Sequence, residues 1–307
     1  MFHNIIAIDL GSNSLRILKM NCETKERLGE FHRTVKTADG LATTGKINAK
    51  ALERIVLALN EAKEKLEFSD AKVKAVTTEA IRQAKNGDEV LKSIEEQTGI
   101  SFEVIDGVAE AKYALAATQN RLKLLGTRAK SFMVVDIGGG STEMMFHYGE
   151  DSSFSKSFQV GIVTVTQKFK GLGEIAEAMP VLMNPMKQYY NQVVGEHGEV
   201  ELFIATAGTP TTIAAMKHGM DYATYDAEKI HGTMLTQKDL VEKLMELIEM
   251  SQEERVKRVG VGRDDLIASG ILIYDELYTI SGFKESMVID DGIREGVAFS
   301  TCEEGRV

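Results

Sequence analysis

The chain has few cysteines and no histidine cluster, and each shortage excludes a class of site. Only two cysteines, Cys22 and Cys302, occur among its 307 residues. They are far apart in sequence and lack the spacing of metal ligands, so we expect reduced, half-buried thiols rather than a disulfide or a redox pair. The six histidines include no H-E-x-x-H or comparable arrangement, which argues against a zinc site.

Basic charge and long apolar runs are also scarce. The net charge is −10 and the pI is near 5.3, whereas proteins that bind nucleic acid usually carry a basic stripe and have a high pI, so nucleic acid is not expected as a partner. No apolar run is long enough to span a bilayer and no signal-peptide core is present, which predicts a cytoplasmic protein without membrane association. A small polyanionic substrate is compatible with this charge if Mg²⁺ and a local basic patch reverse the field.

One short pattern occurs twice, at 6–14 and at 134–143. In each copy an apolar run leads to an aspartate, Gly and Ser follow, and a second apolar run returns, which predicts a strand, a tight polar turn and a second strand. We expect the glycines to adopt positive φ angles and the unpaired N–H groups to form an anion-binding nest. A single copy would fit an ordinary Gly-rich hairpin equally well. The shared register favours two like domains facing one phosphate-bearing ligand, with these matched pairs: Asp9 and Asp136, Gly11 and Gly138, Ser14 and Ser141.

The remaining segments alternate between helical and strand patterns. Asn48 is expected to cap a helix, the pairs Thr236 with Asp239 and Ser251 with Glu254 indicate two more helix starts, and 174–194 is expected to form one helix. With 43% hydrophobic residues the chain can bury two cores of ordinary size. We expect domains at 1–120 and 121–290, with a helix at 291–307 packing back on the first. No low-complexity linker is evident, so we expect helices to join the two domains and the domains to close on each other.

Three further segments carry candidate contacts. A helix start capped by Thr78 would direct Arg82 at the end of the preceding strand. In Ala207–Thr212, Thr209 is expected to be the N-cap and Pro210 the first helical residue. A basic run, Arg121, Lys123, Arg128 and Lys130, is either solvated surface or the contact for a polyphosphate tail. His231 has no evident partner and is expected to shape a turn.

Seven segments together resemble the exopolyphosphatase and guanosine pentaphosphate phosphohydrolase (Ppx/GppA) family: 9–14, 78–82, 107–111, 136–143, 207–212, 231–232 and 292–296. The resemblance spans nearly the whole chain and implies an α/β fold of two actin-like (ribonuclease H-like) domains around an interdomain cleft. Longer family members carry an additional helical region with a His-Asp motif. This sequence contains no His-Asp dipeptide, so it resembles the short, two-domain form.

The resemblance also implies roles for individual residues. Many relatives have two acids where this chain has Ala109 and Glu110, so Glu110 is the candidate catalytic carboxylate; the alternative is a first-turn glutamate that offsets the helix dipole. Asp136 and Glu143, with Asp9 less securely, are candidate Mg²⁺ ligands. The candidate phosphate-binding residues are Gly11, Ser12, Asn13, Ser14, Arg82, Gly138, Gly139, Gly140, Ser141, Thr142, Gly208 and Thr209.

The activity implied is Mg²⁺-dependent hydrolysis of the terminal phosphoanhydride bond of inorganic polyphosphate, with Glu110 activating the water. Hydrolysis of guanosine pentaphosphate is a close alternative, because the shared motifs do not separate the two substrates. A kinase of the same fold is disfavoured because no acceptor-binding insertion is evident. A non-catalytic phosphate sensor is disfavoured by the presence of Glu110, Asp136 and Glu143. The sequence is compatible with a homodimer.

Overall fold

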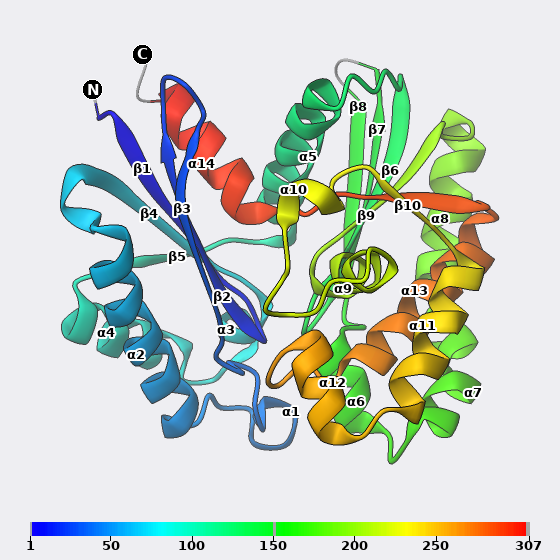
Figure 1. The fold of residues 1–307 in the computed structure, drawn as a ribbon, viewed down its shortest axis with the longest axis horizontal. Helices are drawn as coiled ribbons and strands as arrows, with labels where there is room; N and C mark the ends of the chain where they lie inside the picture. Colours follow the sequence, from blue (N-terminus) through cyan, green and yellow to red (C-terminus); the bar gives the residue numbers. More distant parts are fainter. Residues whose placement is uncertain (1, 150–151, 305–307) are drawn as a thin grey trace. The chain divides into compact units, whose positions relative to one another are not determined.

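The computed structural model of the protein describes residues 2–149 and 152–304 (Figure 1). The chain divides into two compact units, each described here by itself: unit 1 contains Met1–Ala117 and Gly292–Val307, and unit 2 contains Thr118–Asp291. Each unit has its own sheet. The chain passes from unit 1 to unit 2 within one helix, α5, and returns just before the last helix, α14.

Unit 1 is built on a five-stranded sheet in the order β3-β2-β1-β4-β5. Its strands are β1 (Asn4–Leu10), β2 (Ser14–Asn21), β3 (Arg27–Thr34), β4 (Ala71–Thr77) and β5 (Phe102–Val104). Its helices are α1 (Leu41–Thr44), α2 (Ala49–Leu66), the 3₁₀ turn η1 (Phe68–Asp70), α3 (Glu79–Gln83), α4 (Gly87–Thr98), most of α5 (Gly107–Leu124) and α14 (Ile293–Glu304).

Both faces of this sheet are covered, and the alternation of β1 explains how. Successive side chains of a strand point to opposite faces. Ile6 and Ile8 pack in one cluster with residues of α2 and α4, whereas Ile5 and Ala7 pack in a second cluster with residues of α14. Figure 1 shows α2 and α4 on one side of these strands and α14 on the other. A continuous apolar run in β1 is therefore required, because neither face is open to water.

Unit 2 is built on a six-stranded sheet in the order β10-β11-β9-β6-β7-β8. Its strands are β6 (Ser131–Ile137), β7 (Thr142–Tyr148), β8 (Ser152–Phe158), β9 (Leu202–Thr206), β10 (Thr233–Thr236) and β11 (Glu285–Val288). Its helices after α5 are α6 (Ile162–Lys168), α7 (Leu172–Leu182), α8 (Asn184–His197), α9 (Gly208–Lys217), α10 (Ala227–Ile230), α11 (Gln237–Glu249), α12 (Gln252–Val259) and α13 (Ile267–Ser281).

The two sheets share one plan, as the duplicated pattern predicts. In unit 1, β1, β2 and β3 pair antiparallel in succession, and β4 then pairs parallel with β1 on its other side. In unit 2, β6, β7 and β8 form the same meander, and β9 pairs parallel with β6. The two copies of the sequence pattern therefore occupy the same place in two like sheets.

Most expected helix starts are confirmed, with three exceptions, of which the start of α9 is described with the functional site. Asn48 accepts a hydrogen bond from the backbone N–H of Ala51 at 2.8 Å, and the two expected helix starts at Thr236 and Ser251 each have a capping box. Thr78 precedes α3, but its side chain makes no capping hydrogen bond. The helix expected over 174–194 is broken at Met183, where α7 ends and α8 begins.

The expectation of two reduced cysteines is wrong. Cys22 and Cys302 form a disulfide, with 5.3 Å between their Cα atoms and 280 residues between them in sequence. Both residues are buried, because α14 packs on β1 and β2 and places Cys302 beside the residue that follows β2. A separation of this size leaves no local spacing signal, so the pairing could not be deduced from sequence.

This disulfide is expected to contribute strongly to stability, because it closes a loop that includes almost the whole chain. Cys302→Ser should lower the free energy of unfolding by about 2–5 kcal/mol, the usual cost of removing a native disulfide. Urea denaturation of the parent and the variant, with and without dithiothreitol, measures this. In the double variant Cys22→Ser with Cys302→Ser, dithiothreitol should have no effect. Equal urea midpoints for the parent in both conditions would show that the sulfurs are not bonded.

Among the described residues, none of the helices combines the length and the apolar character needed to cross a membrane.

Candidate functional site

The polar turn of unit 1 lies between β1 and β2 and is held from outside by the segment that follows β3. The backbone N–H of Gly11 donates to the carbonyl of Ser14 at 3.0 Å and closes the turn. The carbonyl of Asn13 accepts from the N–H groups of Val35 and Lys36, both at 2.9 Å. The carbonyl of Ser12 accepts from the N–H of Ala38 at 2.8 Å, so all four expected phosphate contacts of this turn are in a fixed backbone conformation.

The turn of unit 2, between β6 and β7, is closed in the same way. The N–H of Gly138 donates to the carbonyl of Ser141 at 2.9 Å. The start of α6 then fixes the turn, because the N–H groups of Ile162 and Val163 donate to the carbonyls of Gly138 and Gly139 at 3.0 and 2.8 Å. The first N–H groups of α6 are thus used within the protein and are not offered to a ligand.

Gly138 is needed for space, and none of the turn glycines is needed for a positive φ angle. None of Gly11, Gly138, Gly139 and Gly140 has a positive φ, which corrects the expectation from the sequence. A Cβ atom on Gly138 would lie 2.9 Å from the carbonyl oxygen of Ser141. A Cβ on Gly161, the residue that precedes α6, would lie 2.4 Å from the carbonyl oxygen of Gly139. Side chains are excluded here because two backbone segments approach closely.

Several backbone N–H groups in the two turns are available to an anion. Within residues 2–149 and 152–304 no acceptor is present for the N–H groups of Ser12, Asn13, Gly139, Gly140 and Ser141. Asn13 is buried, and its side-chain oxygen Oδ1 has no hydrogen-bond partner among the described residues. Buried polar groups in native proteins are nearly always paired, so these N–H groups and the Asn13 oxygen indicate a bound water or a ligand.

The side chains of the unit 2 turn divide into two roles. The Ser141 hydroxyl donates to Glu143 Oε1 at 2.6 Å, and Ser157 of β8 donates to the same oxygen at 2.7 Å. These two serines orient the Glu143 carboxylate, which is 5% exposed. The Thr142 hydroxyl donates to the carbonyl of Val160 at 2.6 Å, so the expected phosphate contact at Thr142 is not offered by its hydroxyl.

The carboxylates of unit 2 fit a magnesium ion. Asp136 and Glu143 are direct partners across the β6–β7 ladder, so their side chains lie on the same face of the sheet. No group of three or more His, Cys, Asp or Glu side chains suited to one metal ion occurs in the described part of the chain. Mg²⁺ does not require such a group, because it is commonly bound by one or two carboxylates and keeps several waters. In unit 1 the partner of Asp9 is the cation Arg16, so the corresponding pair is not a carboxylate pair.

Unit 1 places Glu110 in a buried cluster around Arg82. Glu110 lies in the first turn of α5, and that turn is capped by Asp106, which accepts from the N–H of Ala109 at 2.8 Å. Glu110 is only 4% exposed, and Arg82 donates to it from Nη1. A glutamate that merely offset the helix dipole would be solvated. Burial and pairing with Arg82 therefore favour a functional carboxylate.

Arg82 is held by a second carboxylate and still has donors to offer. Its Nη1 also donates to the carbonyl of Ile105, and its Nη2 donates to Glu79, which is itself buried. Burial by itself lowers the pKa of the guanidinium, but the carboxylates of Glu110 and Glu79 outweigh this and raise the pKa of Arg82. Nε–H and the second Nη2–H make no hydrogen bond within the described residues. Arg82 is therefore a permanently charged donor with N–H groups left for a phosphate.

The segment at the start of α9, also expected to contact phosphate, differs in detail from the sequence expectation. The helix α9 begins at Gly208, its N-cap is Ala207, and Thr209 lies inside the helix. Thr209 is 1% exposed and packs against α13, since a Cβ on Gly270 would lie 2.2 Å from its hydroxyl oxygen. Ala207 has φ 72° and ψ −168°, a conformation almost confined to glycine. The Thr209 hydroxyl has no hydrogen-bond partner among the described residues, so its role as a phosphate contact stays a prediction.

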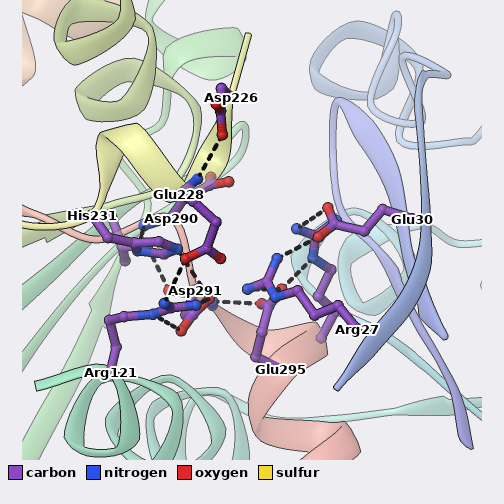
Figure 2. A network of polar contacts seen from close by, with 12 residues as sticks. Arg27, Glu30, Arg121, Asp226, Glu228, His231, Asp290, Asp291 and Glu295 are labelled. Atoms are coloured by element: carbon purple, nitrogen blue, oxygen red, sulfur yellow. Dashed lines mark hydrogen bonds and ion pairs between the residues drawn. The ribbon is translucent and has the colours of Figure 1, made fainter. Parts of the chain in front are cut away.

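Arg121 is not part of an open basic surface, which corrects that expectation. It is 7% exposed, and Nε and Nη2 donate to the two carboxylate oxygens of Asp291 at 2.7 and 3.2 Å. Its Nη1 lies 3.3 Å from Glu228 (Figure 2). His231, expected to lack a partner, accepts at Nδ1 from the N–H of Asp290 and lies 3.6 Å from Asp291 through Nε2. Burial lowers the pKa of His231 although Asp291 opposes this, so the imidazole is neutral near pH 7.

Two residues of the site were missed by sequence reasoning. Glu79 stands three positions before Arg82, a helical spacing that predicts an ion pair and was a usable signal. Ser157 reaches Glu143 from a strand fourteen positions later, because β7 and β8 are paired with Glu143 opposite Ser157. No local pattern marks that contact.

Comparison with known proteins identifies relatives along nearly the whole chain. A sequence profile of the Ppx/GppA phosphatase family matches residues 21–304. Exopolyphosphatase 2 of Mycobacterium tuberculosis is 29% identical over 319 residues, covering 96% of this chain and 98% of the relative.

Solved structures agree with this. The crystal structure of the Aquifex aeolicus Ppx/GppA family member is 30% identical and superposes with a TM-score of 0.73, covering 99% of each chain. An exopolyphosphatase from Cytophaga hutchinsonii gives a TM-score of 0.84 at 21% identity, over 98% of each chain, which supports the fold alone. The expected fold of two actin-like α/β domains, in the short form, is thereby confirmed.

Proposed function

The chain belongs to the Ppx/GppA phosphatase family, and from this premise we propose that it is an exopolyphosphatase, which removes the terminal phosphate of inorganic polyphosphate as orthophosphate. The observation that carries the proposal is the buried Glu110 carboxylate held by Arg82, since it supplies a positioned base beside a permanent cation. A relative named exopolyphosphatase 2, which is 29% identical over 96% of this chain, supports the choice of substrate.

The proposed reaction is a displacement at the terminal phosphorus by water. The water oxygen forms a bond to phosphorus, the bond from phosphorus to the bridging oxygen breaks, and Glu110 accepts the proton of the water. The electron pair of the broken bond stays on the shortened polyphosphate. Arg82 would offer its remaining N–H groups to the terminal phosphoryl oxygens, where negative charge must be neutralised.

Each unit carries one turn that is suited to bind phosphate groups. The available N–H groups of the two turns, at Ser12, Asn13, Gly139, Gly140 and Ser141, are fixed before substrate binds, which lowers the entropic cost of ordering the chain. Asp136 and Glu143 would hold Mg²⁺, which when bound neutralises charge on phosphate oxygens. The hydrogen bonds from Ser141 and Ser157 keep Glu143 in one orientation for that purpose.

Phosphate release from a set of phosphoanhydrides at matched Mg²⁺ tests the proposal. Polyphosphates of defined length, guanosine pentaphosphate and ATP should be compared by kcat/KM. An exopolyphosphatase releases orthophosphate fastest from polyphosphate and acts from the chain end. A higher kcat/KM for guanosine pentaphosphate would replace the proposal by the alternative phosphohydrolase, and the absence of turnover with every substrate would support a sensor.

A further inference from the structure

Unit 2 contains a cavity of about 700 Å³ that the proposed reaction does not use. It lies where the last turn of α5 leads into β6 and where β7 ends. Phe132 of β6 and His147 of β7, which are paired across the ladder, both line it. Phe132 and Ile137 are five positions apart along β6, so at about 3.3 Å per residue the cavity and the polar turn lie roughly 17 Å apart, at opposite ends of this hairpin.

Three positively charged side chains line the cavity. Lys123, Arg128 and Lys130 line it, all three are exposed, and none forms an ion pair within residues 2–149 and 152–304. Among the described residues that line it, the one acid is Glu201, and its carboxylate already accepts from the backbone N–H of Lys130 at 2.9 Å. The chain as a whole carries a charge of −10, so the three cations on the described part of the lining have the sign opposite to the net charge.

Polar groups on the inner wall complete the site. Gln119 Nε2 lies 3.2 Å from His147 Nε2, and His147 Nδ1 lies 3.2 Å from the Ser153 hydroxyl. Burial lowers the pKa of His147, so the ring is neutral near pH 7 and can act only as a hydrogen-bonding group. The wall thus combines neutral polar groups with a cationic rim, which suits a ligand with several anionic oxygens.

We propose that this cavity is a second anion-binding site, separate from the Gly-rich turns, that binds the phosphate groups of an oligophosphate chain. The identity of the ligand rests on the proposed function, because that function brings a polyphosphate to this protein. Two ligands present such phosphate groups. One is the distal part of a long polyphosphate whose terminal phosphate is in the Gly138–Ser141 turn, and the other is a separate short phosphate chain. Nucleic acid fits less well, since the remainder of the chain is acidic.

Binding measurements on a protein that does not turn over test the site directly. Lys123→Gln, Arg128→Gln and Lys130→Gln should be combined in the Glu110→Gln background, and equilibrium dialysis with long polyphosphate and with tripolyphosphate should be performed at low and moderate salt. Exposed charge pairs are individually weak and screened, so the three together should weaken binding of long polyphosphate roughly tenfold and flatten its salt dependence.

A matched control separates the cavity from overall charge. Lys187→Gln, Lys238→Gln and Lys284→Gln change three exposed lysines of the same unit that do not line the cavity. This control should leave both affinities within about twofold of the background, and thermal denaturation should show that both triple variants are folded. If the cavity variant and the control bind both ligands alike, the proposal is wrong.

Tripolyphosphate stoichiometry distinguishes the two sources. If a separate short chain occupies the cavity, the number of tripolyphosphates bound per chain should fall by one in the cavity variant. If the cavity holds the distal part of a long chain, KM for long polyphosphate should rise in the variant with an intact Glu110, while KM for tripolyphosphate and kcat stay unchanged. A protein that binds tripolyphosphate in the cavity but hydrolyses nothing would contradict the proposed function and leave this inference intact.

Discussion

Replacement of Glu110 by glutamine is expected to lower turnover at least roughly 100-fold, which is the usual scale for the loss of a general base. Glutamine has nearly the same shape and keeps an oxygen that can accept from Arg82, so the fold and substrate binding should be preserved. Phosphate release under saturating polyphosphate gives kcat, and equilibrium dialysis of the variant gives the affinity.

The matched control for this experiment is Glu79→Gln. Glu79 and Glu110 are both buried glutamates that pair with Arg82, so each substitution removes one carboxylate from the same guanidinium. Glu79 positions Arg82 and is not the proposed base, so its replacement should affect KM more than kcat and cost less turnover than Glu110→Gln. Similar losses of kcat in both variants would show that orientation of Arg82, and not proton transfer to Glu110, determines the rate.

Replacement of Asp136 by asparagine is expected to raise the Mg²⁺ concentration needed for half-maximal activity roughly tenfold or more, since even partners of metal ligands affect metal affinity on this scale. Thermal stability should change less, because Asp136 is half-buried at the end of a strand and asparagine is of equal size. Activity should be titrated with Mg²⁺, and the melting temperature should be measured without it.

Two comparisons sharpen the magnesium experiment. Glu143→Gln should shift the titration in the same direction, because Glu143 is the cross-strand partner of Asp136. Glu177→Gln, an exposed glutamate on α7, should leave it unchanged. Superimposable Mg²⁺ curves for Asp136→Asn and the parent would remove Asp136 from the metal site.

The residues of the site differ in how well sequence could assign them. The duplicated strand, turn and strand were predictable because apolar alternation and Gly-Ser turns are local, and the structure gives both copies the same turn-closing hydrogen bond, at Gly11 and at Gly138. The role of Thr142 was not predictable. Whether a threonine hydroxyl faces a ligand or packs inside depends on segments far along the chain, here Val160.

The sequence alone determined the strands of both sheets except β10, the helix starts at Asn48, Thr236 and Ser251, and the set of acidic and glycine residues from which a phosphate site can be built. These follow from side-chain periodicity and from hydrogen bonds between residues close in sequence. The tertiary structure alone decided that Cys22 joins Cys302, that Arg121 pairs with Asp291, and that Lys123, Arg128 and Lys130 surround a cavity. Such contacts depend on how helices and sheets pack, and packing brings together residues whose separation in sequence carries no periodic signal.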